Sequence, residues 1–522
     1  MSRSVAITWA LATVVLVAGC GRLGFDELGD GGSSTLEIVA VQPSWAMPAG
    51  GPVRVELGGD TDGVIVAIDG IECAQATATS PRVVECTAPA HAPGSVDVTA
   101  TNASGASARH AKPFAYLTPG MYQLGGPLDD RTSGIAVDAD GNVYVSGGTM
   151  GDLDGPNAGD FDALLIKYDA SGTLAWVRQL GTPLFDYARD VAVDRSGDVT
   201  IVGWGTGDID ASGSTSGGND IFVARYSPDG TLRWVTQTGT SGDDQAWDLA
   251  VDDAGAVAVA AHTTGAFPGH ANVGGIDYVV LRYGPDGALA WLRQDGSVAD
   301  DDGHSIAIGP DGAAFLVGYT RGALTPGAAN AGGLDMYAAR YETDGTRTWI
   351  RQRGSAADDE ATDVTVDADG EVWIAGFTAG TLDGNPNAGG DDVFVMRFGA
   401  SGTWRFTRVH GSVGTENGWG VGVAPGGPVY LSCVTTGAFD GQTYAGGSND
   451  FCMIAMDRDG NHLWTRITGT SGYDGSSSCA VDAARTGMVY ISLITDRSLD
   501  GAANRGGQDV AVAKLDAAGD LR

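Results

Sequence analysis

The chain has 522 residues, a net charge of −35 and 82 glycines against 19 prolines. Glycine without a three-residue period excludes collagen, a hydrophobic share of 43% excludes a disordered polymer, and the acidic charge argues against nucleic acid as a partner. The composition fits an all-β protein of two or three domains whose tight turns use glycine.

Residues 1–19 have the pattern of a secretory signal peptide. Their apolar run, Val5 to Val17, is shorter than the ~20 residues that span a membrane. The ending Val17-Ala18-Gly19-Cys20 resembles a bacterial lipobox, which implies that Cys20 is lipidated and becomes the mature N-terminus. By that resemblance the protein is anchored by lipid in the outer membrane of the cell envelope, facing the periplasm or the outside, and residues 20–35 form a tether.

Export makes disulfides possible. Cys73 and Cys86 lie in one small module and are candidates for a bridge. Cys433 and Cys452 fall on successive strands of one repeat and could also pair, which leaves Cys479. The alternative for these three is that they are small buried hydrophobic residues, and the sequence does not settle the pairing.

Short alternating strands are predicted across residues 36–117, for example at Leu36–Val41 and Val53–Leu57. Strands at this spacing are typical of an Ig-like sandwich. The order of several residues resembles the IPT/TIG family, which implies a spacer or a binding unit. These residues are Pro43, Gly50, Gly51, Val53, Val55, Gly58, Cys73, Cys86, Pro89, Val96, Val98, Asn102 and Gly105.

From about residue 120 the sequence repeats every 57 or 58 residues. Each unit reads as four short strands joined by Gly/Asp turns, which indicates a blade of a β-propeller. One aromatic position recurs in the fourth strand, where it would fill the space between blades. Its members are Trp176, Trp234, Trp291, Trp349, Phe406 and Trp464.

The two ends of this region complement each other. The chain stops just where another Trp strand should begin, and Met121–Gly125 matches the second half of that strand. We therefore predict that the N-terminal fragment supplies the outer strand of the last blade and closes a seven-bladed ring over residues 118–522. The predicted repeats are about 120–176, 177–234, 235–291, 292–349, 350–406, 407–464 and 465–522.

Three segments of the first unit carry a family resemblance: Ile135–Gly147, Asp162–Tyr168 and Gly172–Trp176. They resemble the bacterial β-propeller repeat called SBBP, and the resemblance recurs over about 400 residues. It implies the propeller fold. It implies no particular function, because that family has no common activity.

Two columns of acidic residues recur in every unit. No cofactor is predicted, although a ring of carboxylates could hold Ca²⁺. The favoured interpretation is that these side chains accept hydrogen bonds from backbone N–H groups at turns and strand starts. The first column is Asp130, Asp186, Asp244, Asp301, Asp359, Glu416 and Asp474. The second is Asp162, Asp220, Asp277, Asp335, Asp392, Asp450 and Asp509.

Function in a repeat protein should lie where the repeats differ. The residue that leaves the second strand is a large ring in four neighbouring units, which predicts an aromatic binding patch for a sugar or a peptide; the alternative is packing between blades. Those residues are Trp204, His262, Tyr319 and Phe377. His262, His270 and His304 could also form a Zn-type set on that face, against the alternative of unrelated loop residues.

We expect a non-catalytic, monomeric surface protein that binds a glycan, protein or peptide. The sequence lacks a Gly-x-Ser-x-Gly elbow, a His-Glu-x-x-His motif and a CxxC pair. The alternatives are an enzyme of the lyase, glycosidase or quinoprotein type built on a propeller, and a calcium-binding structural protein.

Overall fold

The structure is a computed structural model. It describes residues 36–42, 45–46, 51–58, 63–80, 82–90, 94–110, 114–116, 121–213, 216–325, 329–482, 488–499, 504 and 506–522. All regular elements in these ranges are β-strands. Within them no helix is long and apolar enough to span a bilayer. The predicted lipidation site, Cys20, and the tether after it lie outside the described residues.

The N-terminal module contains two four-stranded sheets and a smaller third one. In spatial order, the first sheet is β1 (Ile38–Gln42), β3 (Gly51–Leu57), β7 (Val83–Ala88) and β6 (Ala74–Ser80). The second is β10 (Ser107–Arg109), β9 (Val98–Thr101), β4 (Ile65–Ile68) and β5 (Ile71–Glu72). The third is β2 (Trp45–Ala46), β11 (Phe114–Tyr116) and β8 (Gly94–Val96).

The two larger sheets share one core. Alternating side chains of β3, such as Val55, pack in the same cluster as Val66 of β4 and Val98 of β9. This alternation buries one face of each sheet and leaves the other face exposed.

The described residues from 121 onward form seven four-stranded antiparallel sheets. Six of them use four strands that are consecutive in the chain. These are β13 (Asp130–Val137), β14 (Val143–Thr149), β15 (Asp162–Tyr168), β16 (Leu174–Leu180); β17 (Asp186–Val193), β18 (Val199–Gly205), β19 (Asp220–Tyr226), β20 (Leu232–Thr238); β21 (Asp244–Val251), β22 (Val257–Thr263), β23 (Asp277–Tyr283), β24 (Leu289–Asp295); β25 (Asp301–Ile308), β26 (Ala314–Thr320), β27 (Asp335–Tyr341), β28 (Arg347–Arg353); β29 (Asp359–Val366), β30 (Val372–Thr378), β31 (Asp392–Phe398), β32 (Trp404–His410); and β33 (Glu416–Val423), β34 (Val429–Thr435), β35 (Asp450–Met456), β36 (His462–Thr468).

The remaining sheet joins the two ends of this region. It runs in the order β37 (Asp474–Val481), β38 (Val489–Thr495), β39 (Asp509–Leu515) and β12 (Met121–Leu124). Met121 pairs with Ala513 and Leu124 with Val510. The backbone edge of β39 is therefore covered by a strand that lies almost 400 residues earlier in the sequence.

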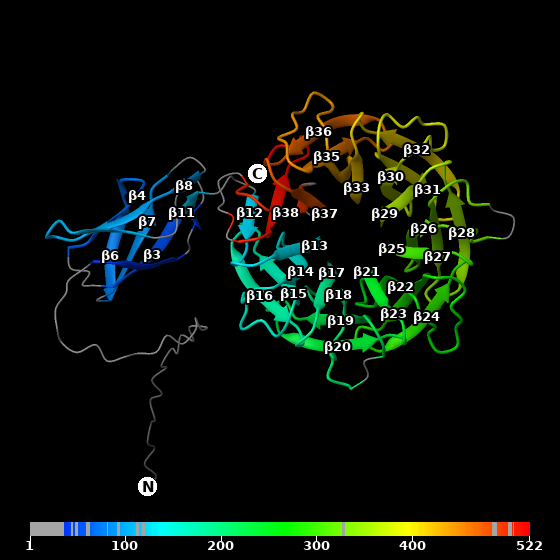
Figure 1. Ribbon diagram of the computed structural model, residues 1–522, viewed down its shortest axis with the longest axis horizontal. Coiled ribbons are helices and arrows are strands. Elements are labelled where there is room, and N and C mark those ends of the chain that lie inside the picture. The colour runs from blue at the N-terminus through cyan, green and yellow to red at the C-terminus, as the bar shows by residue number, and fades with distance from the viewer. Residues whose placement is uncertain are drawn as a thin grey trace, which may run out of the picture.

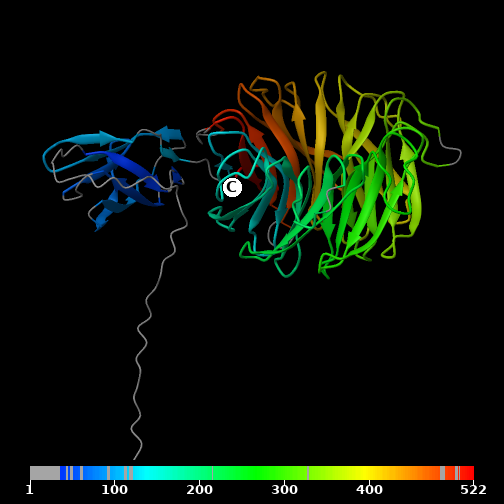
Figure 2. The ribbon, with the colours of Figure 1, turned by 60° about the horizontal axis from the view of Figure 1, so that its bottom comes forward.

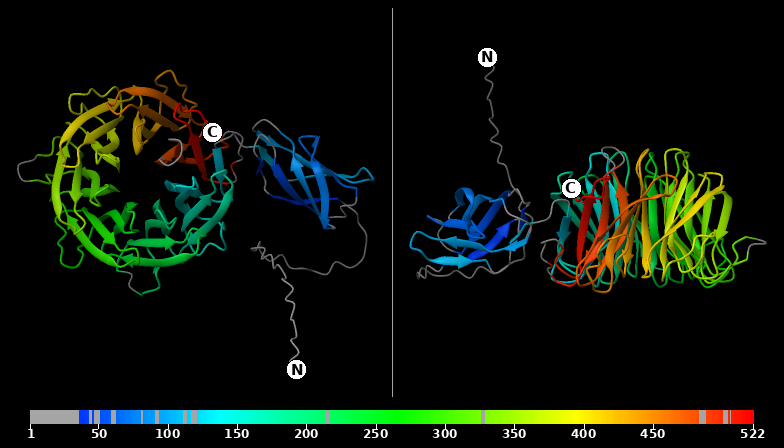
Figure 3. Two further views of the ribbon diagram at one scale, coloured as in Figure 1. Left: turned by 180° about the vertical axis from the view of Figure 1, so that it is seen from behind. Right: turned by 90° about the horizontal axis from the view of Figure 1, so that it is seen from above.

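The sheets stand radially around one axis, as the view along that axis shows (Figure 1). The first strand of each sheet lies nearest the axis and the last lies at the rim, and the tilted and side views show the sheets upright beside one another (Figures 2 and 3). Cores form between neighbouring sheets, including one that joins Ile135 and Val145 of the first sheet to Tyr490 and Val512 of the last.

In five of the seven outer strands the recurring Trp lies between adjacent sheets. The Trp349 indole N–H donates to the carbonyl oxygen of Ala400 in the next sheet, at 3.0 Å, and Trp291 donates to Thr343 in the same way, at 2.9 Å. Trp176, Trp234 and Trp464 repeat the bond. The column thus joins neighbouring sheets, which is the packing role that its position in the sequence predicts.

Candidate functional site: a cavity on the axis

Every first strand contains a β-bulge at the same place. The pairing register shifts there by one residue, and a bulge turns the extra side chain in a new direction. In four sheets the opposite residue of the second strand is glycine; at Gly147, for instance, a Cβ would overlap the carbonyl oxygen of Arg131. The extra residues are Ser133, Arg189, Trp247, His304, Thr362, Trp419 and Ser477.

Six of these bulge residues line one cavity of about 390 Å³ on the axis. The seventh, Ser477, is left aside because the structure does not describe its side chain. The register of each sheet, repeated around the axis, brings residues that are 56 to 58 positions apart onto one wall. The wall also includes Tyr187, Asp190, Asp248, Ser305, Asp363, Asn449 and Tyr473.

A stack of flat side chains forms one part of the wall. The Arg189 guanidinium lies 4.3 Å from the ring centre of Trp247, and Trp247 stacks on His304 at 5.0 Å and 18°. The ring centre of His304 in turn lies 6.4 Å from the ring centre of Trp419. Burial lowers the pKa of Arg189 and the pKa of His304. The stack therefore presents a cation and a neutral imidazole among indole rings.

The protonation of His304 follows from its partner. Its Nδ1 lies 2.9 Å from the carbonyl oxygen of Thr362, which can only accept, so Nδ1 carries the hydrogen. In the neutral ring Nε2 is then an acceptor. Arg189 adds a donor, because its buried Nε has no hydrogen-bond partner among the described residues.

Three carboxyl groups follow the bulges and connect adjacent sheets. Asp248 accepts the backbone N–H of Ile306 at 2.7 Å, and Asp363 accepts that of Val421 at 2.6 Å. The Ser305 hydroxyl lies between them, 2.5 Å from Asp248 and 2.9 Å from Asp363. Each of these contacts crosses from one sheet to a neighbouring one.

Burial changes the charge of this group. It raises the pKa of Asp363 to about 7, with the charge of Asp248 as the next contribution. Burial also raises the pKa of Asp190 well above its ordinary value, again reinforced by Asp248. Asp363 and Asp190 therefore keep a proton to higher pH than an ordinary aspartate, and when protonated each can offer a donor as well as an acceptor.

Two predicted binding residues, His262 and Tyr319, meet at Asp302. Nδ1 of His262 lies 2.8 Å from Asp302 Oδ1 and 2.9 Å from the indole nitrogen of Trp247, and the Tyr319 hydroxyl is also hydrogen-bonded to Asp302. Burial opposes the charged imidazole, but Asp302 outweighs it and the pKa of His262 is raised. This cluster supports Trp247 from behind the cavity wall.

The other two predicted binding residues have different neighbours. Trp204 stacks on Phe185 at 4.7 Å and 12°, and Phe377 contacts Trp419 at 6.2 Å. None of the four predicted residues lines the cavity, although Val434 and Ile494 of the same column do. Their role in binding stays a prediction.

The predicted zinc set of His262, His270 and His304 is not gathered. Among the described residues the only group of three suitably placed metal-binding side chains is His410, Asp440 and His462. The reason is the bulge: it turns His304 toward the axis, while His262 faces Asp302. His270 lies in the loop after β22, where its backbone N–H bonds to Phe267.

The side chains of the two acidic columns accept hydrogen bonds from backbone N–H groups. In the first column every carboxylate accepts the N–H of the residue four positions earlier, as in Asp186 with Thr182 at 2.6 Å, and burial raises the pKa of Asp186. In the second column the carboxylate accepts the N–H of the preceding loop, as in Asp335 with Ala331 at 3.0 Å. Such bonds are the role in turns and strand starts that the sequence favours over a calcium ring.

Of the two disulfides that the sequence suggests, the structure contains one. Cys433 and Cys452 form a disulfide between β34 and β35, with Cα atoms 4.8 Å apart. Cys73 and Cys86 are both free and buried, so the predicted bridge between them is not present. A hydrogen bond from one thiol to the other raises the pKa of Cys73 and replaces the covalent link. Cys479 is free and buried.

Sequence reasoning missed the bulge column, although the signal was there. The residues on either side of the bulge are small or acidic in most units, whereas the bulge position changes from Ser133 to Arg189, Trp247, His304 and Trp419. The bulge and the residue two places before it vary widely between units while the positions around them stay similar, and such variation marks positions that the fold does not dictate.

Comparison with known proteins agrees with this architecture. The family model for the SBBP β-propeller repeat matches residues 122–154 and 175–210. The four-stranded sheets and this match are consistent with a β-propeller. The curated protein called "Regulatory protein FlaEY", from Caulobacter vibrioides, is 25% identical over 395 residues, which cover 66% of this chain and 41% of that protein. The chain thus spans about two fifths of that relative's length.

Solved structures give weaker likenesses. An auxiliary nutrient binding protein from Bacteroides thetaiotaomicron has 12% identity and a TM-score of 0.32, covering 92% of this chain and 97% of that one. A PL25 ulvan lyase has 11% identity and a TM-score of 0.43, with coverage of 74% and 97%. With TM-scores below 0.5, these likenesses do not bear on function.

Proposed function

We propose that this protein is a non-catalytic binding module of the cell envelope, and that its ligand is a small sugar held in the axial cavity. The module consists of an Ig-like unit and a seven-bladed β-propeller, displayed by a lipid on Cys20. The chain acts as a monomer in this proposal, because residues of a single ring line the whole axial cavity.

The propeller assignment is supported by the sheets and their ends. Seven four-stranded sheets stand around one axis, and β12 pairs with β39 (Figure 1). The core that includes Ile135 and Tyr490 joins the first sheet to the last, which is what a ring requires. The Ig-like assignment is supported by two sheets packed over a common core.

The observation that carries the proposed function is the composition of the cavity wall. Its volume of about 390 Å³ is that of a small-molecule site. Trp419 offers an indole surface, and sugars bind with their apolar faces against such rings. Arg189, the carboxyls and the serines offer donors and acceptors for hydroxyl groups, and the unpartnered Nε of Arg189 needs an oxygen acceptor.

A binding role also fits the chemistry of the wall. The Ser305 hydroxyl is hydrogen-bonded to carboxyl groups, not to an imidazole that could act as its base. His304 directs Nδ1 at a backbone carbonyl. The Caulobacter relative is called a regulatory protein, a role that binding modules serve.

The proposal is tested by binding to the full-length protein. A glycan array that contains neutral and acidic sugars identifies the ligand, and calorimetry measures its affinity. We expect Trp419→Ala to weaken binding by at least about tenfold, since truncating an aromatic anchor in a desolvated pocket costs about 2 kcal/mol or more and about 1.4 kcal/mol is tenfold. Trp404→Ala is the matched control, because Trp404 is 41% exposed on the outer strand β32.

Two results would overturn the proposal. One is a ligand whose affinity is the same in wild type and Trp419→Ala. The other is the release of a chemically altered product from a bound sugar, which would make the protein an enzyme.

A further inference from the structure

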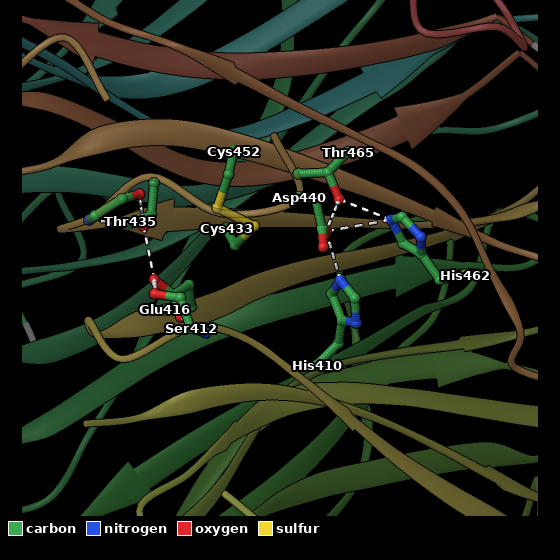
Figure 4. Close-up of a disulfide and its surroundings, with 10 residues drawn as sticks. His410, Ser412, Glu416, Cys433, Thr435, Asp440, Cys452, His462 and Thr465 are labelled. Atoms are coloured by element: carbon green, nitrogen blue, oxygen red, sulfur yellow. Dashed lines mark hydrogen bonds and ion pairs between the residues drawn. A yellow bond between two sulfur atoms is a disulfide. The ribbon is translucent and has the colours of Figure 1, made fainter. Parts of the chain in front are cut away.

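A second cluster of polar side chains lies far from the axis, between the outer strands β32 and β36. His410 ends β32, His462 begins β36, and Asp440 lies in the connection between β34 and β35. Nε2 of His410 is 2.6 Å from Asp440 Oδ2, and Nε2 of His462 is 3.3 Å from the same oxygen. The three side chains converge in Figure 4.

Other sheets show what these positions hold by default. The place of His410 at the end of the outer strand is taken by Asp295 in β24 and Arg353 in β28. The place of His462 at the start of the next outer strand is taken by Arg347 and Trp404. Asp295 pairs with Arg347, and Arg353 lies 4.7 Å from the ring centre of Trp404. The fold therefore brings these two positions together wherever adjacent sheets meet.

The sheet before the cluster is the nearest comparison. There Asp383 occupies the place of Asp440; it pairs with Arg353 and accepts the hydroxyl of Thr407 at 2.6 Å. In the cluster Thr465 bonds to Asp440 at the same 2.6 Å. The aspartate and the threonine are kept, while an arginine and a tryptophan are replaced by two imidazoles. Asp383 is paired with the cation of Arg353, whereas Asp440 faces the ring nitrogens of two histidines.

The cluster is held in place before anything binds. The rings of His410 and His462 stack at 4.5 Å and 17°, with Nε2 of both turned to Asp440. Asp440 has a left-handed backbone, with φ of 52°, as Asp383 has in the preceding sheet. The Cys433–Cys452 disulfide links the two strands from which the Asp440 loop emerges (Figure 4).

We propose that His410, His462 and Asp440 bind a divalent transition-metal ion, with zinc as the preferred ion. Two imidazole nitrogens and a carboxylate oxygen are a zinc donor set, to which water adds the fourth ligand. Zinc–ligand bonds of about 2.0–2.2 Å in a tetrahedron put donor atoms about 3.3–3.6 Å apart. The donor atoms here lie within 4.8 Å of one another, so side-chain rotations suffice.

This site is independent of the axial cavity. Its ligands come from the rim of two neighbouring sheets, β32 and the sheet of β34, β35 and β36, so that a bound ion would join them. All three ligand side chains are 22–33% exposed, which leaves the ion open to solvent on one side.

The test is zinc binding to the full-length, untagged protein, measured by calorimetry, with Co²⁺ absorption as a report of tetrahedral geometry. We expect one ion per chain, and a loss of affinity of more than about 100-fold in His410→Gln/His462→Gln, since even outer partners of a ligand are worth 10–100-fold. His270→Gln is the control, because that histidine lies in another loop and should leave binding unchanged. Circular dichroism confirms that each variant folds.

A second, independent test introduces the two histidines at the equivalent positions of the preceding sheet. Arg353→His/Trp404→His places two imidazoles beside Asp383 and Thr407, which match Asp440 and Thr465, and should raise the stoichiometry to two ions per chain. The proposal is overturned if wild type binds no zinc, or if the double glutamine variant binds zinc as tightly as wild type.

Discussion

Gln294→Leu tests how the loops around the cavity face are fixed. The Gln294 amide is buried and donates to the carbonyl of Gly265 at 2.8 Å and to Asp277 at 2.9 Å, while its oxygen accepts the N–H of Phe267 at 2.9 Å. One side chain thus ties the loop after β22 to the start of β23. Gln179, Gln237 and Gln352 make the same three kinds of bond in their sheets.

The magnitude follows from these bonds. The two neutral bonds contribute about 1 kcal/mol each and the bond to the carboxylate about 1.5–3 kcal/mol. Burial of the leucine methyl groups stabilises the variant by about 1 kcal/mol. Asp277 keeps the backbone N–H of Val273, so no charge is left without a partner. We expect a net loss of about 3 kcal/mol.

Hydrogen exchange of the Phe267 amide measures the local effect. A loss of about 3 kcal/mol corresponds to exchange more than about 100-fold faster. Val409→Gln is the reverse control: Val409 holds the same position opposite Phe394, near Asp392, and glutamine there should slow exchange in its own loop. If the Phe267 amide exchanges at the same rate in Gln294→Leu as in wild type, the Gln294 side chain does not fix this loop.

Two other predictions concern stability. Asp363 keeps its proton up to a pKa of about 7 in the folded state but releases it near 4 when unfolded, so the folded state binds more protons between these values and stability falls as the pH rises through that window. Melting temperatures at pH 5 and pH 7.5 should show this slope, and Asp363→Asn should flatten it; an equal slope in both proteins would contradict the assignment. Cys433→Ala/Cys452→Ala should cost about 3 kcal/mol in denaturant unfolding, the contribution of a bridge that closes a loop of this length, and reductant should lower wild type to the same level. A reductant effect that persists in the double variant would have another source.

The sequence was sufficient for the class of fold and for the roles that recur. Alternation with a period of two gives strands, and the 57-residue recurrence gives sheets of four, because both patterns are local and every unit repeats them. The match of Met121–Gly125 to half a Trp strand led to the strand that pairs with β39. The packing role of Trp349 and the backbone role of Asp186 were also predictable, since a residue kept in every unit serves the unit.

The site was decided at the tertiary level. A bulge depends on how two strands pair, so the sequence shows that this position varies but not that the side chains of Arg189 and Trp247 turn toward the axis. For the same reason the sequence did not show that the aromatic residues at the exits of the second strands lie outside the lining of the axial cavity, and their role in binding stays a prediction.

The histidines show the same limit. His262 and His304 belong to adjoining units and were grouped, whereas His410 and His462 stand 52 positions apart and are brought together only by the contact of two outer strands. By itself the sequence determined the strands, their grouping in fours and the groups that fasten each turn, because hydrogen bonding and burial within a unit depend on residues close in the chain. Only the tertiary structure decided which side chains face one another across units, because that depends on pairing register and on the angle at which sheets meet around the axis.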